Sequence, residues 1–410
     1  MAAPAKILVV TNGPLARNPR AFKEATALGE AGYDVTALTV RNHPPSEPVD
    51  LALLADAPFR RVVLDTGLES ASGFRVFRRR LNHWISRKLV YHLGWQSPRA
   101  LGPYGAQLRL ARRIPADLTI VHNEVPHCLG RRLLDDGRLV AADIEDWHSE
   151  DLLPADRLSR PLKLIRETER DLLHRAAYTT TTSHALADAL HTRYGGRRPT
   201  VVSNSFPLQP PRSPRSPHDG PPAFFWFSQT IGPGRGLEHF LAAWSLTRQP
   251  SRLVLLGETR GGYDTEILSR LPADFRPRVT FLPLVPPAAL PALIARHDIG
   301  LALEQSFILN RDLTITNKII QYLNAGLAIV ASETAGQREV LAQAPAAGVI
   351  IATQETSAFA ATLDTLLADP VMLAARQIAA RHLAEEHYNW EIEAPRLCAL
   401  VAAAMAGARP

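Results

Sequence analysis

The sequence has few cysteines. It holds two cysteines, Cys128 and Cys398, which lie far apart and form no metal-binding or redox spacing, so we predict that both are reduced packing residues. Lys and Arg outnumber Asp and Glu by 46 to 40, and the surplus lies in the N-terminal half. No zinc-binding spacing, RNA-binding signature or long basic tail accompanies that surplus, which argues against a nucleic-acid-binding function.

Long apolar runs are also missing. No uninterrupted apolar stretch approaches the roughly 20 residues that a membrane-spanning helix needs. Residues 1–5 lead straight into an apolar strand, without the layout of a signal peptide. We therefore expect a cytoplasmic protein.

Two segments of the 410-residue chain open in the same way. Residues 6–11 form a short β-rich run, followed by a polar loop and a helical pattern near 20–31. Residues 223–228 form another, followed by a glycine-bearing loop to Gly236 and a helical pattern near 237–246. A strand, a glycine-bearing loop and a helix begin a Rossmann-like unit, so the sequence predicts two such units.

Short apolar strands alternate with helical patterns after each start, which is typical of α/β parallel sheets. The further strands are predicted at residues 35–40, 118–121, 139–144 and 179–182, and at 253–256, 279–282, 299–303 and 328–331. The intervening segment is dense in Pro, Ser and Arg, as a linker is. The predicted domains are residues 1–206 and 223–385, with a linker at 207–222 and a C-terminal helix within 386–410 that crosses back to the first domain.

Residues 74–95 interleave arginines with large apolar side chains at near-helical spacing, which predicts a basic amphipathic helix. Two interpretations stay open. The helix contacts anionic lipid head groups at the inner membrane face, or it packs its apolar face inward and leaves a solvated basic face.

Three passages together resemble family 4 of the retaining glycosyltransferases, which have the GT-B architecture of two Rossmann-like domains facing each other across a cleft. They are Asn18-Pro-Arg20 with the helix that follows, Gly232-Pro-Gly-Arg-Gly-Leu-Glu238, and the segment from Thr316 to Ser332. The third is the most specific, because it looks like the donor-site helix and the next strand of that family.

The residue types around the second and third passages suit a nucleoside diphosphate sugar. Gly232, Gly234 and Gly236 allow close backbone approach to a diphosphate. The guanidinium of Arg235 and the ammonium of Lys318 can neutralise the diphosphate as it leaves.

The resemblance adds further positions to this predicted donor site. Asn317 begins the donor-site helix, and Leu284 lies in the loop that usually meets the base. Gln321 stands where family members usually have a glutamate for the ribose, and a neutral amide accepts hydrogen bonds more weakly. Glu304 resembles an acidic residue that faces the donor sugar, although a pair with Arg311 is an alternative.

In the first domain, polar residues follow predicted strands, where ligands of parallel sheets bind. The resemblance gives His122 a place near the donor sugar, and a capping role is the alternative. The predicted acceptor side consists of Asn18, Arg20, Glu145, Asp146 and His148.

The predicted reaction is therefore transfer of a sugar from a UDP- or GDP-linked donor to an acceptor hydroxyl, with no separate cofactor. The resemblance implies retention of the anomeric configuration and a role in glycan or polysaccharide biosynthesis. Because no Asp-x-Asp motif stands at a strand end, we predict no metal. The acceptor is a glycan, a lipid-linked precursor or a small molecule. A nucleotide-sugar epimerase and a degenerate, non-catalytic member are the alternatives.

Overall fold

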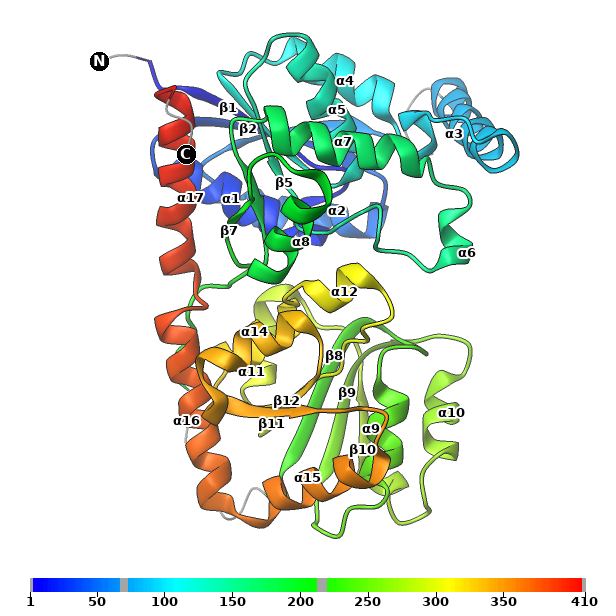
Figure 1. The fold of residues 1–410 in the computed structure, drawn as a ribbon, viewed down its shortest axis with the longest axis vertical. Coiled ribbons are helices and arrows are strands. Elements are labelled where there is room, and N and C mark those ends of the chain that lie inside the picture. Colours follow the sequence, from blue (N-terminus) through cyan, green and yellow to red (C-terminus); the bar gives the residue numbers. More distant parts are fainter. Residues whose placement is uncertain (1–2, 67–72, 212–219, 408–410) are drawn as a thin grey trace. The chain divides into compact units, whose positions relative to one another are not determined.

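The protein forms two compact units, each with its own parallel sheet (Figure 1). The computed structural model describes residues 3–66, 73–211 and 220–407. The first unit comprises residues 1–202 and 394–410, and the second comprises residues 203–393. Part of the predicted linker, residues 212–219, lies outside the described residues.

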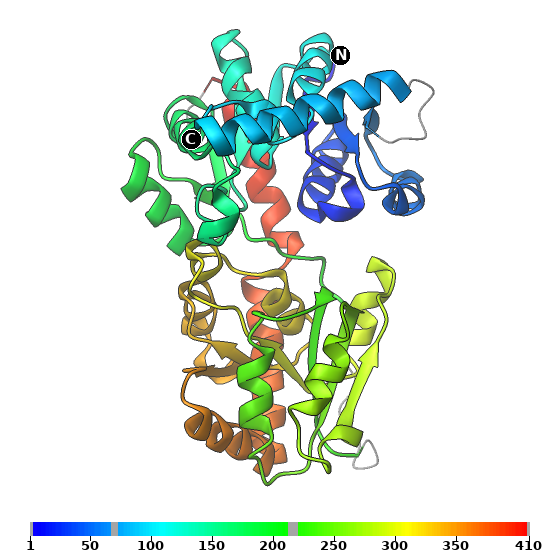
Figure 2. The ribbon, with the colours of Figure 1, turned by 90° about the vertical axis from the view of Figure 1, so that its right-hand side faces the viewer.

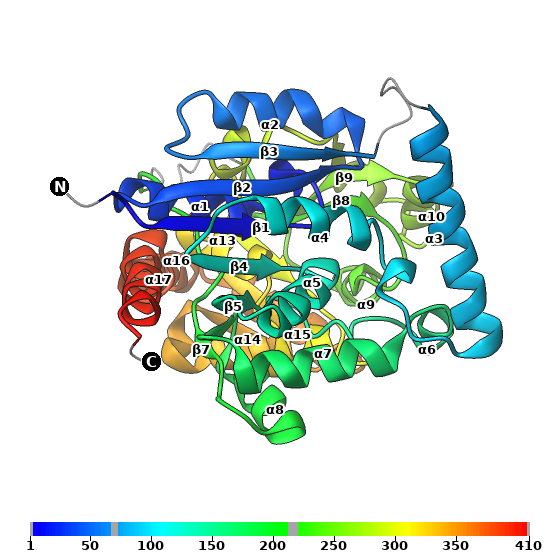
Figure 3. The ribbon, with the colours of Figure 1, turned by 90° about the horizontal axis from the view of Figure 1, so that it is seen from above.

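The sheet of the first unit has the strand order β3-β2-β1-β4-β5-β6-β7, and all of its neighbouring strands are parallel (Figure 3). The strands are β1 (Lys6–Val10), β2 (Asp34–Arg41), β3 (Arg60–Asp65), β4 (Leu118–His122), β5 (Val140–Asp143), β6 (Thr179–Thr181) and β7 (Thr200–Val201). The central strands β1, β4 and β5 are almost wholly buried, because helices cover both faces of the sheet.

Two helices of the first unit, α1 and α8, begin at sequence signals for helix starts. Asn18 accepts a hydrogen bond from the backbone of Ala21, with Pro19 at the first helical position, and Ser183 caps α8 in the same way. The helices are α1 (Pro19–Glu30), α2 (Glu47–Leu54), α3 (Gly73–Leu93), α4 (Tyr104–Arg113), α5 (Glu124–Asp135), α6 (Pro154–Arg157), α7 (Leu162–Arg175) and α8 (His184–Tyr194).

The C-terminal helix α17 (Trp390–Met405) contributes its second part to the first unit. Val401 and Ala404 are buried in one apolar cluster with Ile7 and Leu28, and Cys398 lies 3.8 Å from the backbone oxygen of Ala27. Figure 1 shows this helix, in red, running alongside α1. The prediction that the chain's end crosses back to the first domain is confirmed.

The sheet of the second unit has the order β10-β9-β8-β11-β12-β13, again with parallel neighbours. Its strands are β8 (Ala223–Ile231), β9 (Arg252–Thr259), β10 (Val279–Leu282), β11 (Ile299–Ala302), β12 (Ala328–Ser332) and β13 (Gly348–Ile351). Its helices are α9 (Leu237–Trp244), α10 (Tyr263–Ser269), α11 (Leu290–Ile294), α12 (Leu309–Leu313), α13 (Asn317–Asn324), α14 (Ala335–Gln343), α15 (Thr356–Ala368) and α16 (Pro370–Glu386).

All ten predicted strands are present, and three strands were not predicted: β3, β7 and β13. All three are edge strands of their sheets. β3 mixes charges with valines on a partly exposed edge and β7 is only two residues long, whereas β13 has an apolar sequence that the prediction passed over. The segment between β11 and α13 contains the five-residue helix α12. Both sheets thus follow the doubly wound pattern predicted from the sequence.

Long apolar helices are scarce in the described ranges. There, no single helix combines the length and the apolar composition of a membrane span. Only a pair bent by 95°, α15 with the stretch Pro370–Met405, meets both criteria together.

Candidate functional site

Both sheets reverse their strand order at one pair of neighbours, β1 and β4 in the first unit and β8 and β11 in the second. In open parallel sheets, ligands bind beyond the carboxyl ends of the strands at such a switch point, because the loops leave in opposite directions there. The residues that follow these four strands are therefore the first candidates for binding.

In the second unit, the glycine-bearing loop packs tightly against the end of β11. Gly236 has a φ of +80° and caps α9. A Cβ atom at Gly236 would overlap the backbone oxygen of Leu303 and would lie 2.7 Å from Nε2 of Gln305. The backbone N–H of Gly234 donates to Glu238 at 2.8 Å. The loop is thus held next to the residue that follows Leu303, which is Glu304.

Glu304 is the centre of a charged cluster. Its Oε1 lies 2.5 Å from Nζ of Lys318, and the two side chains are only 11% and 13% exposed. Burial opposes ionisation of Glu304, but Lys318 and, from further away, Arg235 and Arg311 outweigh it and lower the pKa of this carboxyl. Three cations therefore act on one carboxylate, and the surplus of positive charge suits an anionic ligand.

Helix α13 brings Lys318 to this cluster. Its buried face includes Ile319, Ile320 and Tyr322, and its partly exposed side carries Asn317, Lys318 and Gln321. A Cβ atom at Gly300, in β11, would overlap the ring of Tyr322. The glycine lets the helix lie close against β11, and this fixes the start of α13 beside Glu304.

Two expected features of this site turn out differently or stay untested. The alternative pair of Glu304 with Arg311 is replaced by the closer pair with Lys318. Leu284 lies exposed in the loop after β10, the edge strand two places from β8, so its contact with a base stays a prediction.

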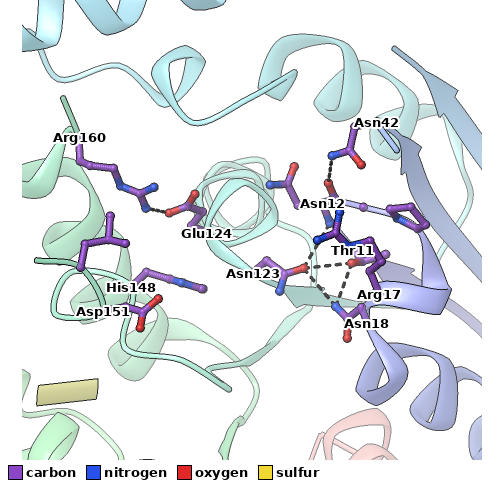
Figure 4. Close-up of a pocket in the computed structure, with 13 residues that line it drawn as sticks. Thr11, Asn12, Arg17, Asn18, Asn42, Asn123, Glu124, His148, Asp151 and Arg160 are labelled. Atoms are coloured by element: carbon purple, nitrogen blue, oxygen red, sulfur yellow. Dashed lines mark hydrogen bonds and ion pairs between the residues drawn. The ribbon is translucent and has the colours of Figure 1, made fainter. Parts of the chain in front are cut away.

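The first unit contains a polar pocket of about 310 Å³ at its own switch point (Figure 4). Its lining comes from the ends of β1 and β4 and from three further loops. The lining residues are Thr11, Asn12, Gly13, Pro14, Arg17, Asn18, Asn42, Asn123, Glu124, His148, Asp151, Leu152 and Arg160. The predicted acceptor residues Asn18 and His148 are both among them.

Four asparagines form one side of this pocket, and hydrogen bonds fix their positions. Oδ1 of Asn123 accepts from the hydroxyl of Thr11 at 3.0 Å and from Nδ2 of Asn18 at 3.1 Å. Nδ2 of Asn42 donates to the backbone oxygen of Asn12 at 3.0 Å. Amides both donate and accept, so such a surface matches the hydroxyl groups of a sugar.

The opposite side of the pocket carries His148, Asp151 and an ion pair between Arg160 and Glu124 (Figure 4). Burial lowers the pKa of His148 to about 4, so its imidazole is neutral near pH 7. The neighbouring Ser149 is held by the buried Glu169, which accepts from its backbone N–H at 3.0 Å and from its hydroxyl at 2.8 Å. His148 thus sits on a braced loop as an uncharged proton acceptor.

His122 and Arg20 belong to a buried network and do not line the pocket. Nε2 of His122 lies 2.5 Å from Glu24, and its Nδ1 lies 3.1 Å from Asp143. The guanidinium of Arg20 donates twice to Asp143, at 2.7 Å each. Burial alone would lower the pKa of His122, but the two carboxylates raise it to about 10.

These contacts correct two expectations. The His122 side chain is 1% exposed, with a carboxylate at each ring nitrogen, and Arg20 is equally enclosed, so neither side chain is open to a sugar. The two cations instead balance Glu24 and Asp143 and hold α1 against the ends of β4 and β5. We assign both residues a structural, positioning role.

Glu145 and Asp146 follow β5 and are partly buried, and neither lines the pocket. Burial and the neighbouring Asp146 raise the pKa of Glu145 to about 7. Their contact with an acceptor stays a prediction.

No three His, Cys, Asp or Glu side chains gather at a possible metal site within the described ranges. The predicted absence of a metal stays a prediction.

Sequence reasoning missed most of the pocket. Thr11, Asn12 and Asn123 directly follow β1 and β4, so their position after a strand was a usable signal; His122 was chosen one residue too early. Asn123 is also the one non-glycine residue with positive φ, +68°, in the described chain. Arg17, Asp151 and Arg160 come from loops whose sequence carries no comparable signal.

Two Rossmann-like units, each with polar residues at its switch point, define the class of fold. Family models match both halves. The model described as glycosyl transferase 4-like domain matches residues 18–205, and the model described as glycosyl transferases group 1 matches residues 221–369. The chain belongs to the family 4 glycosyltransferases and has the GT-B fold.

Solved structures with the same fold are distant in sequence. Sucrose-phosphate synthase from Thermosynechococcus elongatus has a TM-score of 0.72 and 14% identity, over 98% of this chain and 100% of the other. HepE from Anabaena, solved with UDP and glucose, has a TM-score of 0.71 and 16% identity, over 97% of this chain and 100% of the other. WaaG, a glycosyltransferase of lipopolysaccharide biosynthesis, has a TM-score of 0.61 and 14% identity, over 96% of this chain and 99% of the other. No curated protein matches significantly in sequence.

Proposed function

We propose that this glycosyltransferase takes a sugar from a nucleoside diphosphate sugar bound at the second unit's switch point. The acceptor hydroxyl belongs to a molecule bound in the first unit's pocket. The observation that carries the proposal is the cluster at Glu304, where Lys318, Arg235 and a closely packed glycine loop occupy one strand end.

The donor site suits a diphosphate for electrostatic reasons. Cleavage of the glycosidic bond leaves a nucleoside diphosphate with an added negative charge, and preorganised cations lower the barrier to that step. Lys318 is already oriented by Glu304, so it needs little reorganisation when phosphate oxygens arrive. HepE is solved in complex with UDP, which supports a uridine nucleotide as the first donor to test.

The pocket of the first unit favours a transferase over an epimerase, because an epimerase needs no acceptor site. Its amides suit neutral hydroxyl groups, and the neutral imidazole of His148 is available to orient an acceptor hydroxyl or take its proton. His148 is therefore our candidate for acceptor contact, together with Asn12, Asn42 and Asn123.

The family resemblance supports retention of configuration as part of this proposal. In that mechanism the departing phosphate assists deprotonation of the acceptor on the same face of the sugar, with Arg235 and Lys318 stabilising the phosphate. We also propose that the acceptor is a glycan or a lipid-linked glycan precursor, in a biosynthetic pathway, with no metal and no separate cofactor. The location we propose is the cytoplasm, at the inner membrane face.

The test begins with titration calorimetry of UDP, GDP and ADP against the full chain. We expect micromolar binding of one nucleotide and its loss in Lys318→Ala. Donors with that nucleotide are then incubated with acceptor panels, and products are read by mass spectrometry and by the NMR coupling of the anomeric proton. An inverted anomer would overturn retention.

Two outcomes would replace the proposal. Conversion of the donor sugar into its epimer without any acceptor would identify an epimerase. Failure of every nucleotide to bind would identify a degenerate protein, consistent with glutamine instead of glutamate at position 321.

A further inference from the structure

Helix α3 presents its large apolar side chains to solvent. Phe77, Leu81, Trp84 and Ile85 recur at the i, i+4, i+7, i+8 spacing of one helix face. All four are exposed, with Phe77 61% and Trp84 58% accessible. The interpretation in which the apolar face packs inward is therefore wrong for these residues.

The opposite side of α3 attaches the helix to the first unit. Ser86 and Val90 are buried. The ring of His83 lies 3.0 Å from the backbone oxygen of Arg99, and the guanidinium of Arg87 donates to Ser159 at 3.0 Å. These contacts fix the rotation of the helix about its axis, so the apolar face points outward because of the way the helix is anchored.

The charge along this stretch of the sequence has one sign. Residues 70–116 contain no Asp or Glu but ten Lys and Arg. Arg78, Arg80 and Lys88 are exposed on α3, and Nζ of Lys88 lies 6.0 Å from the ring centre of Trp84. Cations thus surround and interrupt an apolar strip, with no acidic side chain in this stretch of sequence to neutralise them.

We propose that the outward face of α3, formed by Phe77, Leu81, Trp84 and Ile85 with Arg78, Arg80 and Lys88, docks on an anionic phospholipid bilayer. The helix lies in the plane of the interface, its aromatic and aliphatic side chains enter the head-group boundary, and its cations meet lipid phosphates. Figures 2 and 3 show α3 as a long helix on the outside of the first unit.

The exposed surroundings of the helix favour a membrane over a second copy of the chain. Two copies joined through this face would bring Arg78, Arg80 and Lys88 of each copy together, and like charges oppose that arrangement. A bilayer rich in anionic lipids offers both the missing negative charge and an apolar layer. Tyr91 and Leu93 in the last turn of α3, and Trp95 just beyond it, are large apolar side chains that are also exposed.

The proposal is independent of the donor chemistry and is tested without it. The full chain is sedimented with vesicles of phosphatidylcholine alone and of phosphatidylcholine with 30% phosphatidylglycerol (about the anionic content needed for a strong surface field). We expect binding to the second composition only, weakened by raising the salt concentration, because surface charges are screened.

Two variants separate the contributions. Arg78→Glu/Arg80→Glu/Lys88→Glu should reduce the partition coefficient at least about tenfold. Phe77→Gln/Trp84→Gln should reduce it by a similar factor and diminish the blue shift of tryptophan fluorescence on vesicle addition, since Trp95 is still present. Circular dichroism establishes that each variant is folded.

Matched control variants carry the same kinds of substitution at exposed positions outside α3. Arg193→Glu/Arg248→Glu/Arg260→Glu alters the net charge equally, and Leu246→Gln/Ile378→Gln removes two exposed apolar side chains. Both controls should bind vesicles as the original chain does. Equal loss in the controls, or no vesicle binding by the original chain, would overturn the proposal. So would dimers that disappear in Phe77→Gln/Trp84→Gln, because they would identify a second copy as the occupant.

Discussion

The two switch points of this protein share a topology and differ in chemistry. In the first unit, cations and carboxylates are paired inside the protein, as in the network of Arg20, His122 and Asp143, and one side of the pocket presents four asparagine amides. In the second unit, Lys318, Arg235 and Arg311 act on a single carboxylate, Glu304. The cluster in the second unit therefore keeps an excess of positive charge, whereas the charges of the first unit form buried ion pairs that stabilise the fold.

The difference follows from what stands directly after each strand. The glycine loop after β8 carries Arg235 and leads into the N-terminus of α9, a combination that suits a diphosphate. Asparagines after β1 and β4 hold each other through hydrogen bonds and suit hydroxyl groups. The same sheet edge can therefore bind a charged donor or a neutral acceptor, according to a few residues.

Removal of Lys318 should have the largest effect. Lys318→Ala deletes the ammonium beside Glu304 and leaves a partly buried carboxylate without its closest partner. We expect kcat/KM to fall by about 10² to 10³ and nucleotide binding to weaken strongly. Steady-state kinetics and calorimetry measure both. Unchanged nucleotide affinity would show that the two sites do not differ in the way proposed.

The buried charges around His122 in the first unit should affect the free energy of unfolding and not the binding of ligands. The folded-state pKa of His122 is raised from 6.5 to about 10, so the folded protein holds an extra proton between these values. The free energy of unfolding should therefore fall as pH rises from about 6.5 to 10, by a few kcal/mol. Denaturant titrations at several pH values measure it.

The variants His122→Gln and His148→Gln sharpen this test. His122→Gln should flatten the alkaline decline. His148 has a lowered pKa of about 4, so its contribution changes only below pH 6.5, and His148→Gln should leave the alkaline decline intact.

The packing of the glycine loop can be tested with a matched pair. Gly236→Ala and Gly261→Ala both place a side chain at positive φ, +80° and +63°. Only at Gly236 does the new Cβ overlap the backbone of Leu303; at Gly261 no atom lies within 4 Å. We expect a loss of about 1 kcal/mol at Gly261 and about 2 kcal/mol more at Gly236, with donor binding lost only there. Equal losses would contradict the packing argument.

On the acceptor side, Asn42→Ala removes an amide that borders the pocket and its bond to Asn12. The acceptor KM should rise about fivefold, as expected for one hydrogen bond, while nucleotide affinity stays constant. A change in nucleotide affinity would show that the two sites are not chemically separate.

Restoration of the family's usual acidic residue should have the smallest effect. Gln321→Glu places a carboxylate on the partly exposed side of α13, one turn after Lys318. A charged acceptor holds a ribose hydroxyl more strongly, so nucleotide affinity should increase about threefold. Calorimetry measures the change, and weaker binding would indicate that the diphosphate is repelled.

Much of the fold could be predicted because buried parallel strands leave apolar runs, such as 299–303 and 328–331, that stand out against helical patterns. The charged cluster at Glu304 was equally accessible, since Gly236, Arg235 and Lys318 lie in specific local motifs. The edge strand β3 was missed because its sequence, Arg60 to Asp65, mixes charges with valines on a partly exposed edge.

The role of His122 could not be predicted, because strand position alone cannot tell which of two successive residues faces a ligand. His122 is buried with Glu24, 98 residues away in sequence, and Asn123 turns toward the pocket through its positive φ. Long-range ion pairs of this kind have no local signature. Arg160, which lines the pocket from a loop and pairs with Glu124, was missed for the same reason.

The left-handed backbone of Asn123 makes this position unusually suitable for design. Glycine adopts such a conformation without strain, so Asn123→Gly should preserve the path of the chain while it deletes an anchor shared by Thr11 and Asn18. Asn18 would still cap α1 and donate to Thr11, so the scaffold would stay intact while the space left by the asparagine side chain admits a differently shaped molecule.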